Sequence, residues 1–170
     1  ETGQLIVQDY PRLIAEDNRY PDTYLGRLVG GGCPVHSADV GWMNERLPMT
    51  ATIREAAARA SAQIGQPVHF LDISGLFAGR ELCARQAEHI DGLAPADVTA
   101  RAERIAMVRI FPPFQPTEGL HPNQLGQQAE QACLRDAIND GRARSGRCEA
   151  PLDWGQVDAT GLPLVRFVAG

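Results

Sequence analysis

The sequence predicts an α/β fold around a parallel sheet, and three observations support that class. Residues 4–8 and 67–73 are short apolar runs of the kind that form buried strands. Residues 37–64 carry a helical pattern, and no further strand is predicted between the two runs. A strand, a helical crossover and a second strand form a βαβ unit. With 170 residues, 44% of them hydrophobic, the chain is long enough for one domain with a real core.

The first predicted strand leads into Asp9, Tyr10 and Pro11. This is the carboxyl end of the strand, where α/β folds place their functional sites, so Tyr10 is a candidate substrate-binding residue. Residues 12–38 have no sustained period and include a turn-rich stretch around Cys33. They predict a long loop pinned by that cysteine, and loops of this length often line a binding cleft. We interpret His36, in this loop, as a solvated surface histidine.

The crossover and the second strand follow. One face of the predicted crossover repeats at helical spacing, through Ile53, Ala57, Ala60 and Ile64. Pro48 should kink this segment or divide it into two helices, because proline removes a helical hydrogen bond, and Gly65 should end it. His69 falls inside the second strand and is expected to be packed there rather than catalytic.

Residues 84–117 are harder to assign. A short helix is predicted up to about residue 106, and 107–110 is either a short edge strand or an extended stretch. Three prolines in the stretch that follows, 111–116, exclude regular structure. Beyond the last helix, a connector rich in arginine and glycine leads to 162–168, which has the composition of an edge strand.

The stretch from Glu118 to Gly126 carries the functional prediction. Pro122 suits a helix entry, and Asn123 can cap a helix that runs from Gln124 to about Asp140. One face of that helix is apolar at helical spacing, through Leu125, Ala129, Ala132, Cys133, Ala137 and Ile138. His121 would then lie on a rigid turn, well placed for proton transfer near neutral pH. The alternative is a capping loop with an ordinary surface histidine.

The pattern acid-x-x-His-Pro-Asn-x-x-Gly-Gln, followed by an alanine-rich helix, resembles the last sequence block of the SGNH (GDSL-type) esterases and lipases. The resemblance implies an SGNH-hydrolase-like (flavodoxin-like) three-layer fold with a parallel sheet. It implies that His121 is the general base of a Ser-His-acid triad. Glu118 occupies the acid position, where the family usually has Asp, so either its longer side chain or a backbone carbonyl would orient His121. Phe111 and Phe114 flank the approach to His121, and they form either an apolar wall for an acyl chain or a cover for the core.

The family's nucleophile motif is missing. The chain contains no Gly-Asp-Ser, and Ser74 follows a segment that resembles the family's last strand rather than its first. We therefore interpret Ser74 as a turn-capping residue. The chain resembles the C-terminal half of the family domain, with residues 1–140 supplying the βαβ part and last helix and 141–170 an extension. A complementing N-terminal chain or segment is expected to supply the serine and the oxyanion hole, because two strands alone leave sheet edges open.

Four cysteines lie far apart near loop segments, and none has Cys-x-x-Cys spacing. This favours two disulfides in an oxidising compartment over a metal site, four free thiols being the alternative. Of the three possible pairings, we favour Cys33–Cys83 and Cys133–Cys148, each of which ties neighbouring elements. Secreted actinobacterial members of the SGNH family are similar in having a cysteine after the Tyr-Pro loop and another after a Phe-containing turn.

The net charge of the chain bears on which classes of function are possible. A net charge of -5 argues against a basic nucleic-acid-binding surface. No metal or cofactor is expected. The resemblance implies a secreted or extracytoplasmic ester hydrolase acting on a lipid, a small acyl ester or an acylated glycan. The alternative is a non-catalytic secreted module that binds a partner through the long loop around Cys33.

Overall fold

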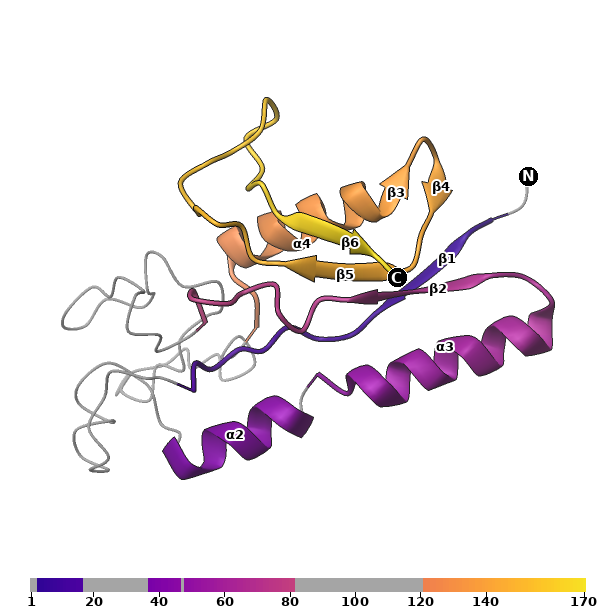
Figure 1. Cartoon of the computed structure of the whole chain (residues 1–170), viewed down its shortest axis with the longest axis horizontal. Coiled ribbons are helices and arrows are strands. Elements are labelled where there is room, and N and C mark those ends of the chain that lie inside the picture. Colours follow the sequence, from indigo (N-terminus) through magenta and orange to yellow (C-terminus); the bar gives the residue numbers. More distant parts are fainter. Residues whose placement is uncertain (1–2, 17–36, 47, 82–120) are drawn as a thin grey trace, which may run out of the picture. The chain divides into compact units, whose positions relative to one another are not determined.

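The computed structural model describes residues 3–16, 37–46, 48–81 and 121–170. The fold is α/β, with a mixed four-stranded sheet and helices (Figure 1). The chain divides into two compact units, and the sheet belongs to the first. The first unit comprises Glu1–Pro11, Arg46–Leu76 and Gln128–Gly170, and the second comprises Arg12–Glu45 and Phe77–Gln127. No helix within the described segments combines the length and hydropathy that crossing a bilayer requires.

The predicted strand–helix–strand unit is present in the first unit. Strands β1 (Leu5–Gln8) and β2 (Val68–Asp72) pair in parallel. Helix α3 (Thr50–Ile64) lies between them in sequence and packs against both. The predicted division of the helical segment near Pro48 is confirmed, because α2 (Ser37–Arg46) is a separate helix. Gly65 ends α3 with a φ of 65°, a left-handed conformation that glycine adopts without steric cost.

Two further strands extend the sheet beyond β2. Strand β5 (Gly146–Glu149) pairs in parallel with β2, and β6 (Arg166–Ala169) pairs antiparallel with β5, so the order is β1-β2-β5-β6. The sequence predicted an edge strand near β6 but not β5, and it predicted a parallel sheet. Strand β5 was not predicted because its sequence, Gly-Arg-Cys-Glu, contains no apolar run. Strand β6 runs antiparallel to β5, so the sheet is mixed rather than parallel.

Helix α4 (Gln124–Ala137) is shorter than predicted. The sequence suggested that it continues to about Asp140, but β3 (Ile138–Asn139) and β4 (Arg142–Ala143) form an antiparallel hairpin there. Asp140 and Gly141 link these strands with φ values of 51° and 73°. Two positive φ values in a two-residue Asp-Gly turn are typical of a tight hairpin, which explains why the helix stops.

Helices α3 and α4 cover opposite faces of the sheet. Asp72 of β2 is in register with Arg147 of β5, so their side chains share a face. Arg54 of α3 forms an ion pair with Asp72, which places α3 on that face. Cys148 is the next residue of β5 and therefore points the other way, where it forms a disulfide with Cys133 of α4. The core of the first unit lies between these layers and includes Ala57, Phe70, Leu71, Ile73, Ala129, Ala132, Cys133, Ala137 and Cys148.

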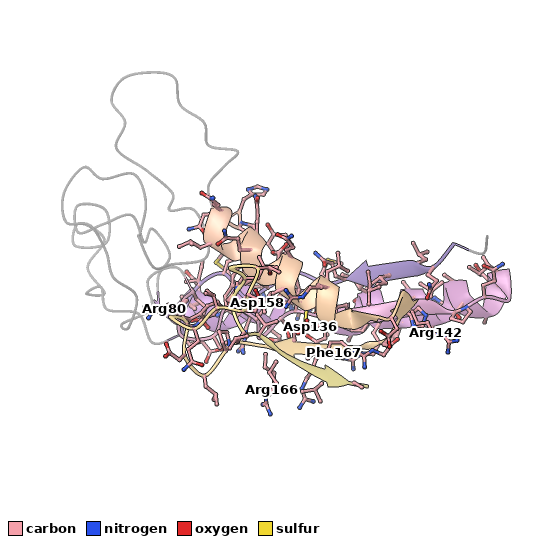
Figure 2. The ribbon with its side chains drawn as sticks, turned by 90° about the horizontal axis from the view of Figure 1, so that it is seen from above. Arg80, Asp136, Arg142, Asp158, Arg166 and Phe167 are labelled. Atoms are coloured by element: carbon pink, nitrogen blue, oxygen red, sulfur yellow. A yellow bond between two sulfur atoms is a disulfide. The ribbon has the colours of Figure 1, made fainter. Side chains whose placement is uncertain are left out.

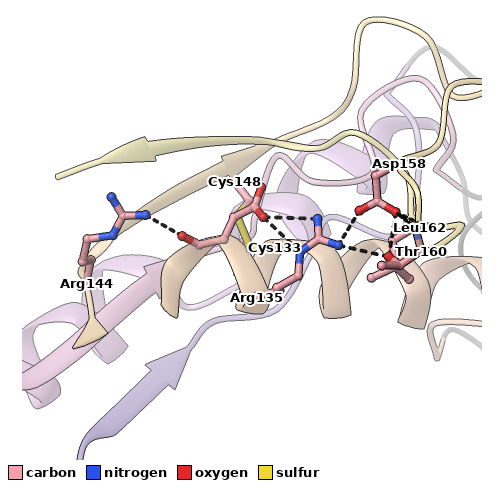
Figure 3. Close-up of polar contacts among 8 residues, drawn as sticks. Cys133, Arg135, Arg144, Cys148, Asp158, Thr160 and Leu162 are labelled. Carbon is pink, nitrogen blue, oxygen red and sulfur yellow. Dashed lines mark hydrogen bonds and ion pairs between the residues drawn. A yellow bond between two sulfur atoms is a disulfide. The ribbon is translucent and has the colours of Figure 1, made fainter. Parts of the chain in front are cut away.

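The long connection from β5 to β6 is held against α4 by polar contacts (Figure 3). Arg135 of α4 donates to the Asp158 carboxylate and, at 3.2 Å, to the Thr160 hydroxyl. Asp158 also accepts the backbone N–H groups of Thr160 at 2.7 Å and Leu162 at 3.1 Å. Because one carboxylate satisfies several donors of this loop, the pKa of Asp158 is lowered, first by the Thr160 hydroxyl.

Gly146 leaves no room for a side chain. An added Cβ would lie 2.5 Å from the backbone oxygen of Val168 and 2.6 Å from Cζ of Phe167. The Arg144 guanidinium carbon lies 4.7 Å from the centroid of the Phe167 ring and holds the ring in place. Phe167 belongs to β6 and is labelled in Figure 2. This close approach explains why glycine begins β5.

We expect Gly146→Ala to destabilise the protein by about 2 kcal/mol, because an overpacked site forces the strands apart. Thermal unfolding should show a decrease in Tm of roughly 4–8 °C. Gly75→Ala is the matched control, since nothing lies within 4 Å of its added Cβ. Equal Tm values for the two variants would contradict the packing argument.

Candidate functional site

The predicted histidine turn is formed at the start of α4. The side-chain oxygen of Asn123 accepts the backbone N–H of Gly126 at 3.0 Å, and its carbonyl oxygen accepts that of Gln127 at 2.8 Å. Asn123 is therefore the helix cap that the sequence predicted. His121 precedes this cap and is exposed. A capped helix start fixes the backbone beside the imidazole and leaves the ring accessible to other groups.

Several predicted site residues lie outside the described residues. They are Glu118, Phe111, Phe114, His36, Cys33 and Cys83. The acid position of the predicted triad, the predicted apolar wall and the predicted Cys33–Cys83 bridge therefore stay predictions. The other predicted bridge is present, with Cys133 and Cys148 joined at an S–S distance of 2.08 Å.

A second cluster of polar groups lies in the first unit, where β1 and β2 end. Asp9 follows β1 and is only 3% exposed. One of its carboxylate oxygens accepts the Ile73 N–H at 2.6 Å, and the other accepts the hydroxyl of Thr50, the first residue of α3. Its own N–H donates to the Leu71 carbonyl oxygen at 3.3 Å. A single aspartate thus joins the ends of both strands to the start of α3.

Ser74 lies beside this cluster but is bonded as a turn residue. Its hydroxyl donates to Oδ1 of Asp72 at 2.7 Å, and its N–H donates to the same oxygen at 3.1 Å. The other Asp72 oxygen accepts from Arg54 at 3.3 Å. A side chain that accepts from the backbone two residues later is typical of an Asx-turn, so Asp72 is the capping residue here and Ser74 donates to it.

Burial raises the pKa of Asp9 to about 6. The hydrogen bonds from Thr50 and Ile73 act in the opposite direction, and the nearby Asp72 carboxylate raises the pKa further. A carboxyl group that titrates near this pH is unusual for aspartate, and such groups cluster at functional sites as well as in structural networks.

Tyr10 lies on the opposite side of β1 from Asp9, since neighbouring residues of an extended strand alternate. It is half-buried, and its pKa is raised by burial and by the charge of Glu130 on α4. Burial also raises the pKa of Glu130, against a hydrogen bond from Gln8. The predicted substrate-binding residue Tyr10 therefore has the half-buried carboxylate of Glu130 as its neighbour.

Sequence reasoning missed Asp9 and Thr50 as members of this polar cluster, and it missed Glu130 as the charged neighbour of Tyr10. The available signal was an aspartate directly after an apolar strand, at the end of a sheet where sites form. Within the described segments, no group of three or more His, Cys, Asp or Glu residues is arranged to hold a metal ion.

These features define an α/β protein with a polar junction at the carboxyl ends of two parallel strands and a capped histidine turn at the start of a helix. Comparison with protein-family models, curated proteins and solved structures finds no match for this chain.

Proposed function

We propose that this chain is the C-terminal part of a serine ester hydrolase of the SGNH type, with His121 as its general base. The observation that carries the proposal is the exposed His121 directly ahead of the Asn123-capped helix α4. The parallel β1–β2 pair with α3 as its crossover fits the C-terminal βαβ part of such a fold. Glu118, three residues before His121, orients the imidazole in this proposal.

In the proposed reaction, His121 accepts the proton of a serine hydroxyl as the oxygen attacks the ester carbonyl carbon. The tetrahedral intermediate then collapses, and His121 returns the proton to the departing alcohol. Water hydrolyses the acyl-serine by the same route, with His121 again accepting and donating one proton. The proposed substrate is a carboxylic ester: a lipid, a small acyl ester or an acylated glycan.

The serine comes from outside residues 1–170 in this proposal. Ser74 is a poor candidate because its hydroxyl donates to Asp72, whereas a triad serine donates to an imidazole. Asp72 also forms an ion pair with Arg54. Asp72 and Ser74 therefore form a structural turn rather than a catalytic pair.

The open edge of β1 is evidence in favour of a complementing segment. Asp9 donates its N–H to β2, so the backbone groups of Ile6 and Gln8, which alternate with it, point toward the opposite edge. Leu5 on this strand is 52% exposed. In the described part of the chain β1 pairs only with β2, and an apolar strand with open amides favours pairing with another strand. The partner we propose is an N-terminal chain or segment that adds strands there.

The Cys133–Cys148 disulfide supports a secreted or extracytoplasmic location, since such bonds persist in oxidising compartments. The same feature would suit a non-catalytic secreted module, so activity is the discriminating property.

We expect the 170-residue chain alone to be inactive and the intact protein to hydrolyse short-chain chromogenic esters. A fluorophosphonate probe should label the intact protein on a serine outside this chain. On size-exclusion chromatography the isolated chain should associate or aggregate through its open edge. A monomeric chain that turns over ester and is labelled on Ser74 would contradict the proposal, and an intact protein that neither reacts nor hydrolyses would favour the binding module.

A further inference from the structure

Asp9 holds the start of α3 without help from a local cap. Met49 occupies the cap position with a φ of 52°, and its side chain makes no capping hydrogen bond. The hydroxyl of Thr50, the first helical residue, donates instead to Asp9 across the fold. The same carboxylate accepts the Ile73 N–H at 2.6 Å where β2 ends. Loosening of this one side chain therefore releases the helix start and both strand ends together.

A second carboxylate lies next to Asp9 on the same face of the sheet. Gln8 is in register with Leu71, so the following residues, Asp9 and Asp72, are neighbours across the two strands. Asp9 is 3% exposed and the side chain of Asp72 is 17% exposed. Two adjacent carboxylates with little solvent between them repel each other when both are ionised, and such pairs hold a proton more tightly.

The charged groups around the pair do not neutralise Asp9. On α3, Arg54 bonds to Asp72 at 3.3 Å and is itself 60% exposed, so water screens its charge. Among the described residues, Asp9 forms no ion pair. Tyr10 and Glu130 lie on the α4 side of β1, and an ionised Glu130 adds further negative charge to this region.

We propose that Asp9, Thr50 and Asp72 form an acid-strengthened clamp, in which uptake of one proton by Asp9 tightens α3 on the ends of β1 and β2. Protonated Asp9 keeps its contacts, because its carbonyl oxygen still accepts from Ile73 and its new O–H can donate to the Thr50 oxygen. The clamp loosens when Asp9 loses this proton beside the Asp72 carboxylate. This inference concerns the fold and is independent of the proposed esterase activity.

Proton linkage gives the direction in which the stability of the folded protein changes with pH. The pKa of Asp9 is raised from 3.8 to about 6 in the folded protein, so the folded state binds a proton more tightly than the unfolded state. The stabilisation is fully present below pH 3.8 and is lost as the pH rises through about 6. At neutral pH the clamp is at its weakest.

The test is hydrogen–deuterium exchange of the intact protein at pH 5 and pH 7.5, corrected for the intrinsic rate. We expect peptides covering the start of α3 to lose protection at the higher pH, with the opening equilibrium rising about 10-fold between the two pH values. Asp9→Asn should remove this difference, because its amide can bond to both Ile73 and Thr50 without a charge. Glu130→Gln, on the opposite face, should retain it.

A titration of ¹³C-labelled aspartate carboxyl groups gives an independent result. The Asp9 signal should titrate near pH 6, and Asp72→Asn should move its midpoint to lower pH by removing the neighbouring charge. This variant covers the case in which Asp9→Asn does not fold, because Asp72 is less buried. An Asp9 midpoint near 4, or an Asp9→Asn protein with the wild-type pH dependence, would overturn the proposal.

Discussion

Replacing His121 with alanine in the intact protein is expected to abolish ester turnover and to leave the fold unchanged. The loss should be at least about 10⁴-fold in kcat, because a serine without its base is a poor nucleophile at neutral pH. The residue is exposed and precedes the Asn123 cap, so its side chain contributes little to packing. Steady-state kinetics with a chromogenic ester, together with Tm by thermal unfolding, measure both effects.

His36→Ala is the matched control, since it removes a histidine that we assign no catalytic role. It should keep wild-type turnover. Glu118→Gln should reduce turnover less than His121→Ala, because Glu departs from the Asp usual in the resembling family. Near-normal turnover by His121→Ala would rule out the triad assignment and leave the capped turn as a purely structural feature.

Removing the Cys133–Cys148 disulfide is expected to cost about 3 kcal/mol of folding free energy. The bond closes a loop with a sequence separation of 15, and the loop-entropy model predicts a stabilisation of that size. Tm should fall by roughly 6–12 °C in the double variant Cys133→Ala/Cys148→Ala. Both sulfurs are buried, so alanine avoids placing an unpaired hydroxyl in the core.

The same bond has a local role that the double variant should reveal. Strand β5 is in register with β2 over only Leu71–Gly146 and Asp72–Arg147, and the disulfide fixes its far face to α4. Amide exchange should therefore increase first in β5 and β6 in the variant. Non-reducing peptide mapping of the wild type provides the reference, and it also tests the predicted Cys33–Cys83 bond. A variant that unfolds at the wild-type temperature would show that packing alone holds β5.

The strands and helices that the sequence predicted best are those with a strong local signal. The apolar runs that became β1 and β2 lie within one residue of the predicted bounds. Pro48 separated two helices because proline cannot continue one, and Asn123 capped α4 because its side chain matches the free amides of a helix start. Each of these depends on a few neighbouring residues, which is the information that a sequence carries directly.

Other features depended on residues far apart in the chain. Strand β5 has the sequence Gly-Arg-Cys-Glu, which carries no strand periodicity, and it becomes a strand because β2, β6 and the bond to Cys133 hold it. The Asp140-Gly141 turn ended α4 although the apolar pattern continued into Ile138, which the structure leaves exposed.

By itself the sequence determined the α/β class, the βαβ unit, the capped turn that carries His121, and the favoured pairing of Cys133 with Cys148. Only the tertiary structure decided that the sheet has four strands in mixed orientation and that Asp9 is buried against Asp72 and Thr50. The physical reason is that burial and charge proximity arise when β1, β2 and the start of α3 meet. Nothing in the few residues around Asp9 specifies what the rest of the chain places next to its carboxylate.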